Sequence, residues 1–191
     1  LINKAVVYMN TDNYIKASES YNKIIDNVKL YNAVDHVILA LCYKFYSRFD
    51  EALKLLDKAI EIEPKNVFPL FGKADIFYNQ GKYDEALTFY DKAIELEPKN
   101  AYPLFGKANV LYTKGKYDDA LKCYADSPYE QIDYNRIMLR CKVLFNLGKY
   151  LDALTKYREL ERMNHNTANL FMRMAECYYK KGDSSSAMQY Y

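Results

Sequence analysis

The sequence predicts an all-α protein, an α-solenoid of tandem antiparallel helix hairpins. The first observation is self-similarity: residues 67–100 read VFPLFGKADIFYNQGKYDEALTFYDKAIELEPKN, and residues 101–124 repeat most of these letters about 34 positions later. The second observation is that each repeat holds two stretches of helical periodicity with a short break between them. A period of this length indicates stacked units, each made of two helices, rather than one closed globule.

Small side chains recur in a fixed frame within the repeats. Two small residues lie twelve positions apart, and a third small or apolar residue follows seven positions later. The sets are Ala5, Ala17 and Ile24; Ala40, Ala52 and Ala59; Ala74, Ala86 and Ala93; Ala108, Ala120 and Ser127; Cys141, Ala153 and Leu160; and Ala175 with Ala187. Because a small side chain lets two helix backbones approach closely, we expect these residues to lie where helices cross.

Glycine and proline mark the ends of the predicted helices. Glycine follows the first helix of four repeats, where a left-handed backbone commonly ends a helix. These residues are Gly81, Gly115, Gly148 and Gly182. Pro64 and Pro98 follow a second helix and prevent its continuation. Pro69 and Pro103 fall in the first turn of a first helix, where a missing N–H group has no consequence.

These marks predict a single array that spans residues 1–191. Its approximate repeats are 1–32, 33–66, 67–100, 101–133, 134–167 and 168–191, of which the first and last are truncated. The sequence starts without Met and stops inside a predicted helix, so we expect it to be a segment of a longer protein. Tyrosines after the glycines, namely Tyr83, Tyr117 and Tyr150, are expected to wedge between hairpins.

Two stretches depart from the repeat. Ser127 to Glu130 forms a capping box with proline at the first helical position, so one helix is expected to end near Asp126 and the next to begin near Pro128. The helix that begins there would be longer than its counterparts. In the last repeat Ser184 replaces the wedge tyrosine, and we expect this truncated repeat to be the least stable.

Composition and charge exclude several classes of function. The formal net charge is only +2, which argues against a nucleic-acid or anionic-membrane partner. No apolar run approaches the length of a membrane span, and the first residues do not read as a signal peptide. Without a CxxC pair, the four cysteines are expected to be core thiols in a reducing, cytoplasmic compartment. They are Cys42, Cys123, Cys141 and Cys177.

Nothing in the sequence favours catalysis. His36 and His165 lie in different repeats, and there is no phosphate-binding loop, nucleophile elbow or metal-ligand spacing. Carboxylates and lysines alternate along the helices, which is typical of solvated faces. We therefore expect a non-enzymatic protein with no cofactor and no metal.

The sequence resembles the tetratricopeptide repeat family. The match lies in the frame of small residues, in the Gly-x-Tyr-x-x-Ala runs (Gly81 to Ala86, Gly115 to Ala120 and Gly148 to Ala153), and in the closing Pro64 and Pro98. It covers essentially the whole chain. The family's frequent tryptophan near the start of the first helix is absent, and His36, Leu70 and Leu104 stand in its place. The resemblance implies a right-handed superhelix.

The resemblance also implies a concave groove, lined mainly by first helices, in which partner peptides or helices lie. Its inner positions, carried over residue by residue, give a candidate peptide-binding groove. The residues are Val37, Leu41, Phe68, Phe71, Asp75, Tyr78, Tyr102, Phe105, Asn109, Tyr112, Met138, Lys142 and Phe145. Flanking positions are Val34, Lys44, Asn135, Asn169, Met172, Glu176 and Tyr179.

This set is mainly apolar and aromatic, with one polar residue in each central repeat. An apolar peptide or an amphipathic helix is therefore the expected partner. Aromatic residues would supply most of the affinity, namely Phe71, Tyr78, Phe105 and Tyr112. Asp75, Asn109 and Lys142 would set the register of the partner. The competing interpretation is that single rings pack between neighbouring helices.

The family's carboxylate clamp for chaperone tails is not apparent. It needs Lys and Asn on successive first helices, followed by Lys and Arg. Val37 and Leu41, or Phe71 and Asp75, stand where the leading Lys and Asn would be. Gly72 and Gly106 replace its middle Asn. We therefore expect that this chain does not bind chaperone tails.

Other functions remain open from the sequence. Apolar residues near the two ends could let copies of the chain stack head to tail, Leu1, Val6 and Val7 against Tyr190 and Tyr191. The chain could also be the docking or regulatory segment of a larger protein. Nucleic-acid binding is a distant alternative because few paired cations accompany the rings.

Overall fold

The structure, a computed structural model, describes residues 32–125, 134–163 and 167–190, together with residues 16, 19 and 165. It divides the chain into two compact units, Leu1–Pro98 and Lys99–Tyr191. In these described residues all regular secondary structure is α-helical, which confirms the predicted fold class. Some predictions concern residues outside the described ones. They are those on Ala5, Ala17, Ile24, Ser127, the capping box near Pro128, and the end residues Leu1, Val6, Val7 and Tyr191.

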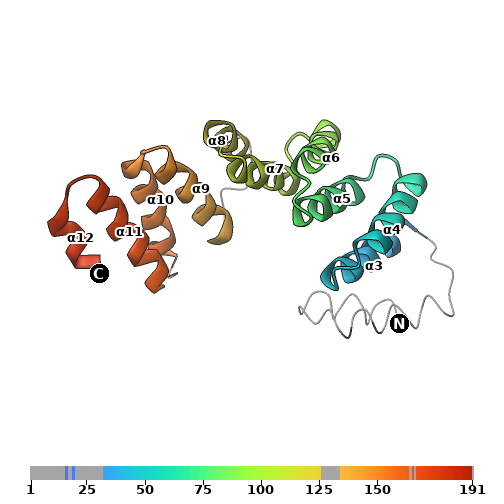
Figure 1. The fold of residues 1–191 in the computed structure, drawn as a ribbon, viewed down its shortest axis with the longest axis horizontal. Coiled ribbons are helices and arrows are strands. Elements are labelled where there is room, and N and C mark those ends of the chain that lie inside the picture. The colour runs from blue at the N-terminus through green and yellow to red at the C-terminus, as the bar shows by residue number, and fades with distance from the viewer. Residues whose placement is uncertain are drawn as a thin grey trace. The chain divides into compact units, whose positions relative to one another are not determined.

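Consecutive helices pair as hairpins in both units (Figure 1). The described helices of the first unit are α3 (Ala33–Phe45), α4 (Phe49–Ile62), α5 (Val67–Asn79) and α6 (Tyr83–Leu96). Those of the second unit are α7 (Ala101–Thr113), α8 (Tyr117–Ala125), α9 (Tyr134–Asn146), α10 (Tyr150–Arg162), α11 (Ala168–Lys180) and α12 (Ser184–Tyr190). The tightest packing is within a hairpin, as between α5 and α6, and the second helix then packs on the first helix of the next hairpin, as α4 does on α5.

Side-chain caps explain where the first helices begin. The Oδ1 atoms of Asn66 and Asn100 accept hydrogen bonds from the backbone N–H groups two residues later, both at 3.0 Å. At the start of α11, the hydroxyl of Thr167 accepts the N–H of Leu170 at 3.2 Å. Such caps satisfy N–H groups that have no partner inside the helix.

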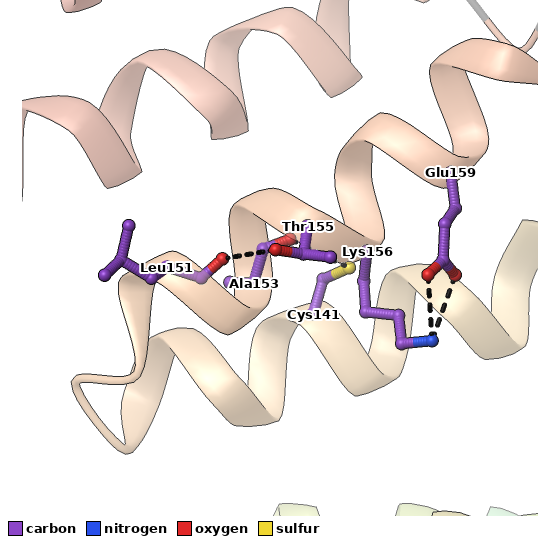
Figure 2. Close-up of polar contacts among 6 residues, drawn as sticks. All are labelled: Cys141, Leu151, Ala153, Thr155, Lys156 and Glu159. Atoms are coloured by element: carbon purple, nitrogen blue, oxygen red, sulfur yellow. Dashed lines mark hydrogen bonds and ion pairs between the residues drawn. The ribbon is translucent and has the colours of Figure 1, made fainter.

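The predicted crossing residues are buried where the structure describes them. Every one from Ala40 to Ala187 is at most 3 % exposed. Figure 2 shows the crossing of α9 and α10, where the sulfur of Cys141 lies 3.8 Å from the backbone oxygen of Ala153. A longer side chain than cysteine or alanine would separate the two backbones, so the small-residue frame sets the spacing within each hairpin.

Two polar contacts in the same hairpin lie within α10 itself. The hydroxyl of Thr155 donates to the backbone oxygen of Leu151 at 3.0 Å, and Lys156 pairs with Glu159 at 3.0 Å (Figure 2). These local contacts support one helix and do not join hairpins.

The glycines behave as predicted, and one other residue shares their conformation. Gly81, Gly115, Gly148 and Gly182 have φ between 72° and 81°. Ser47 ends α3 at the corresponding place with φ 58°. A serine in this left-handed region is strained because its Cβ approaches the following carbonyl oxygen.

Replacing Ser47 with glycine is expected to raise the free energy of unfolding by about 1 kcal/mol, because the strain of the left-handed backbone is removed. Urea unfolding followed by helical circular dichroism measures the change. The matched control is Gly81→Ser, which should lower stability by about the same amount. A Cβ at Gly81 would meet no atom within 4 Å, so this substitution isolates the backbone term. A loss of stability in Ser47→Gly would contradict the strain.

The wedge tyrosines contact rings of their own hairpins. Tyr83 lies 5.9 Å from Tyr78, and Tyr117 lies 5.6 Å from Tyr112, between ring centroids. Tyr150 packs on Phe145 and also against the core of the second unit, which includes Leu170 of the next hairpin. These rings therefore close the turn end of each hairpin.

None of the described helices combines the length and apolar character that crossing a membrane requires.

Candidate functional site

The candidate site in the first unit is a stripe of side chains along α3 and α5, which lie in contact. We call it the unit 1 face. Its members are Val34, Val37, Leu41, Lys44, Phe68, Phe71, Asp75 and Tyr78. Two of them are largely open to solvent, since Val34 is 52 % and Phe68 is 59 % exposed. Side chains of this size that stay exposed at equivalent places on successive helices are typical of a binding surface.

Phe71 and Tyr78 are only partly open because each leans on a neighbouring ring. Phe71 lies 6.2 Å from Tyr90 of α6, between ring centroids, and Tyr78 lies 5.9 Å from Tyr83. Both are half-buried, and Val37 and Leu41 are half-buried as well. The competing interpretation of the sequence therefore applies in part, since these rings combine packing with surface.

Asp75, the acidic residue of the unit 1 face, already has hydrogen-bond partners within the chain. One carboxylate oxygen of Asp75 accepts a hydrogen bond from Lys44 of α3 at 2.9 Å, and the other accepts the hydroxyl of Tyr90 at 2.7 Å. The Lys44 and Asp75 side chains are only 22 % and 26 % exposed. Burial, and next to it the Asp75 charge, raise the pKa of the Tyr90 hydroxyl, so it stays a donor. Asp75 thus joins two hairpins.

A cavity of about 700 Å³ opens beside the two exposed residues of the unit 1 face. Val34 and Phe68 line it together with the loop from Glu63 to Val67 and with Glu97. The loop residues were not predicted as part of a site. In the sequence this loop is marked by the repeated Glu-Pro-Lys-Asn segment, whose proline predicts only the end of a helix.

The second unit carries a corresponding stripe along α7, α9 and α11, which we call the unit 2 face. Along α7 its members are Tyr102, Phe105, Asn109 and Tyr112. Tyr102 is 56 % exposed, whereas Phe105 packs on Tyr124 with 5.9 Å between ring centroids. The Tyr124 hydroxyl donates to Asn109 Oδ1 at 3.2 Å. This contact parallels Tyr90 and Asp75, with an amide in place of the carboxylate.

Farther along the unit 2 face the predicted residues differ in exposure. Met138 is only 5 % exposed and belongs to the core, so it does not line an open surface as predicted. Tyr179 is 64 % exposed and Met172 is 43 % exposed. Phe145 is half-buried against Tyr150, at 5.3 Å between centroids.

The remaining predicted residues of the unit 2 face are polar. Lys142 is half-buried, Asn169 is exposed, and the side chain of Asn135 lies outside the described residues. Glu176 accepts a hydrogen bond from Arg173 at 2.8 Å, so this carboxylate already has a cation beside it.

Sequence reasoning missed Arg136, which lies over the unit 2 face. Its guanidinium carbon is 5.1 Å from the Tyr102 ring centroid and 5.3 Å from that of Phe105. The corresponding position in the two preceding hairpins is Pro69 and Pro103, and nothing in the repeat pattern points to a cation there. A cation held over aromatic faces combines charge with stacking in one place.

The cysteines offer no reactive thiol. Cys42, Cys123, Cys141 and Cys177 are buried thiols outside any disulfide, as predicted. Burial raises the pKa of Cys42 to about 11 and that of Cys177 to about 12, so both stay protonated at neutral pH.

The described histidines and acidic groups form no metal site either. The buried His36 donates from Nδ1 to the Asn32 carbonyl oxygen at 2.9 Å, which is a local helix contact. In the part of the chain that the structure describes, no group of three or more His, Cys, Asp or Glu could hold a metal ion.

The paired helices and their frame of buried small residues define a helical repeat protein. Comparison with family models identifies the repeat family. The description tetratricopeptide repeat matches residues 1–27, 46–89 and 140–191, and the description TPR repeat matches residues 74–115. The chain belongs to the tetratricopeptide repeat family, as the sequence predicted.

Solved structures show the same fold. One is PilW, described as a widely conserved type IV pilus biogenesis factor, at 16 % identity and TM-score 0.81, with 99 % of this chain and 88 % of that chain covered. Another is YrrB, described as a TPR protein with an unusual peptide-binding site, at 20 % identity and TM-score 0.72, with 91 % and 90 % covered.

A third is a tetratricopeptide repeat protein from Parabacteroides merdae, at 17 % identity and TM-score 0.70, with 99 % and 75 % covered. No curated protein matches the sequence. At these identities the likeness establishes the fold.

Proposed function

We propose that this chain is a non-enzymatic scaffold that binds a segment of a partner protein on its first-helix faces. The observation that carries the proposal is the exposure of Val34, Phe68 and Tyr102. These residues hold the same position in three successive hairpins, and each is more than half exposed. Exposed apolar side chains at this repeated position offer contact area to a peptide or helix on the first-helix face of each unit.

The family and one neighbour support the same reading. Tetratricopeptide repeat proteins commonly bind peptides or helices through their first helices, and YrrB is described as having an unusual peptide-binding site. Partly buried aromatic contact would come from Phe71, Tyr78, Phe105, Tyr112 and Phe145. Val37 and Leu41 would add aliphatic contact. A cytoplasmic location and the inability to hold chaperone tails remain part of this proposal.

The test removes exposed rings without disturbing the core. Phe68→Ala combined with Tyr102→Ala should abolish capture of partners, with at least a tenfold loss in recovered protein, as expected for hot-spot aromatics. Capture on the immobilised chain followed by mass spectrometry gives the measurement. Helical circular dichroism should not change, because both side chains are more than half exposed.

The matched control is Ile62→Ala combined with Leu151→Ala. These residues are 45 % and 62 % exposed, one in each unit, and neither lies on a first helix. The control variant should keep the partners. Equal capture by the two double variants would contradict the assignment of the binding surface.

Self-association is the second candidate. Met188 of α12 is 77 % exposed and Tyr179 of α11 is 64 % exposed, so the last hairpin carries apolar surface that another copy could cover. Sedimentation over a range of concentrations separates the two functions, since a monomer at high concentration would contradict self-association.

A further inference from the structure

The cavity of about 700 Å³ in the first unit lies where four helix ends meet. Val34 lines it from the first turn of α3, and Phe68 from the first turn of α5. Glu63 directly follows α4, and Glu97 directly follows α6. The start of a helix carries a partial positive charge and its end a partial negative charge, so two starts and two ends largely offset each other. The charged side chains therefore decide which ligand the cavity favours.

Two carboxylates and one ammonium group line this cavity, on Glu63, Glu97 and Lys65, so its lining carries a net negative charge. The side chain of Asn66 donates to Glu63 Oε2 at 2.8 Å and accepts the N–H of Phe68 at 3.0 Å. This neutral amide holds the Glu63 carboxylate beside the start of α5 and leaves its charge in place. Among the residues that the structure describes, no cation forms an ion pair with Glu63.

The apolar part of the lining is open to a ligand as well. Val34 is 52 % and Phe68 is 59 % exposed, and Pro64 beside Glu63 is exposed too. An aromatic face attracts a cation, and the stem of a lysine or arginine packs on apolar side chains while its charged group stays near a carboxylate. A purely apolar ligand would instead take the Glu63 carboxylate out of water without a partner, which costs free energy. The cavity therefore favours a ligand with an apolar stem and a cationic end.

We propose that this cavity takes a lysine or arginine side chain of the partner segment, with an apolar residue next to it. The cationic group would lie at the Glu63 carboxylate, its stem would pack on Phe68, and the apolar neighbour would cover Val34. Lys65 is exposed and forms no ion pair among the described residues, so its charge would oppose this ligand and moderate the affinity. This inference rests on the proposed function and adds the chemistry of the partner.

The experiment selects displayed random peptides on the 191-residue chain and removes those that also bind its Phe68→Ala variant. Because Phe68 is more than half exposed, this variant should keep the fold. We expect the remaining peptides to carry Lys or Arg next to an aromatic or aliphatic residue. Fluorescence anisotropy then compares the best peptide with a copy in which norleucine replaces the basic residue, which keeps the stem and removes the charge. The norleucine copy should bind at least roughly fivefold more weakly.

Two substitutions on the same loop should act in opposite directions. Glu63→Gln can still accept the hydrogen bond of Asn66, yet it should weaken binding of the basic peptide roughly threefold and leave the norleucine copy unchanged. Lys65→Gln removes the opposing charge and should strengthen binding of the basic peptide about twofold. The matched control is Glu85→Gln, an exposed carboxylate in the first turn of α6, about 18 Å along that helix from Glu97. It should change the binding of neither peptide.

The outcomes separate this inference from the proposed function. Selected peptides without a basic residue, or equal binding of the basic peptide and its norleucine copy, would overturn the preference for a cation and leave the scaffold function intact. Selected peptides that are acidic and lose affinity for Lys65→Gln would overturn it as well, because the cavity would then prefer the opposite charge. So would an absence of peptides that distinguish the chain from Phe68→Ala. The proposed function is contradicted by a different result, namely equal capture of partners by the unmodified chain and by Phe68→Ala combined with Tyr102→Ala.

Discussion

Replacing Tyr157 with alanine is expected to lower the free energy of unfolding by about 3–5 kcal/mol, the largest stability change predicted here. Tyr157 of α10 is only 1 % exposed and lies in the core of the second unit, with Leu160, Leu170 and Met174. Alanine would leave a cavity that these buried neighbours, held on α10 and α11, can fill only in part. Urea unfolding measures the loss.

Two variants control for this result. Tyr157→Phe keeps the ring and nearly all of its volume, so it should lose less than about 1.5 kcal/mol. Tyr179→Ala removes a ring that is 64 % exposed in the same unit and should change stability by less than about 0.5 kcal/mol. Equal losses at Tyr157 and Tyr179 would show that the core of the second unit is not organised around the buried ring. In the Tyr157→Ala variant, the rate of amide hydrogen exchange in α9–α12 should rise as the free energy of unfolding falls.

Replacing Asp75 with alanine is expected to cost about 2–3 kcal/mol. The substitution leaves the buried Tyr90 hydroxyl without its acceptor and the largely buried Lys44 ammonium without its counter-ion. The free energy of unfolding from urea titration is the measurement. This loss of stability comes from the junction between the hairpin α3–α4 and the hairpin α5–α6, because Lys44 and Asp75 lie on either side of it.

The chain itself suggests the control for Asp75. In the second unit Asn109 accepts the hydroxyl of Tyr124 at 3.2 Å, so an amide can serve in this position. Asp75→Asn should therefore keep the bond to Tyr90 and lose less than about 1 kcal/mol, the part that comes from the ion pair with Lys44. If the alanine and asparagine variants were equally destabilised, the hydroxyl contact would not matter and the ion pair alone would account for the effect.

The fold could be predicted from sequence because its determinants are local and repeat. Ala74 and Ala86 mark a helix crossing by their size alone, and Gly81 marks a turn by its backbone freedom. Ser47 escaped prediction because serine carries no such signal, and its φ of 58° is imposed by the hairpin around it. Repeated packing overrides the preference of a single residue.

The candidate site was less predictable because burial and pairing depend on neighbouring hairpins. Asp75 was expected to set the register of a partner, yet Lys44, 31 positions earlier, and Tyr90 already use its two oxygens. Met138 follows the same spacing as Phe71 and Phe105 but is buried in the core of its unit. Arg136 lies where the two preceding repeats carry proline, so only the structure could show it above two rings.

The doubly bonded carboxylate of Asp75 has a consequence for how such a protein can diverge. Any exchange of this residue that altered recognition would also loosen a junction between hairpins, so its evolution is constrained by foldability. At the corresponding place on α7, Asn109 accepts the hydroxyl of Tyr124 at 3.2 Å as a neutral amide, so an exchange there would break no ion pair between hairpins. New binding preferences in descendants of this chain should therefore arise first through its C-terminal half.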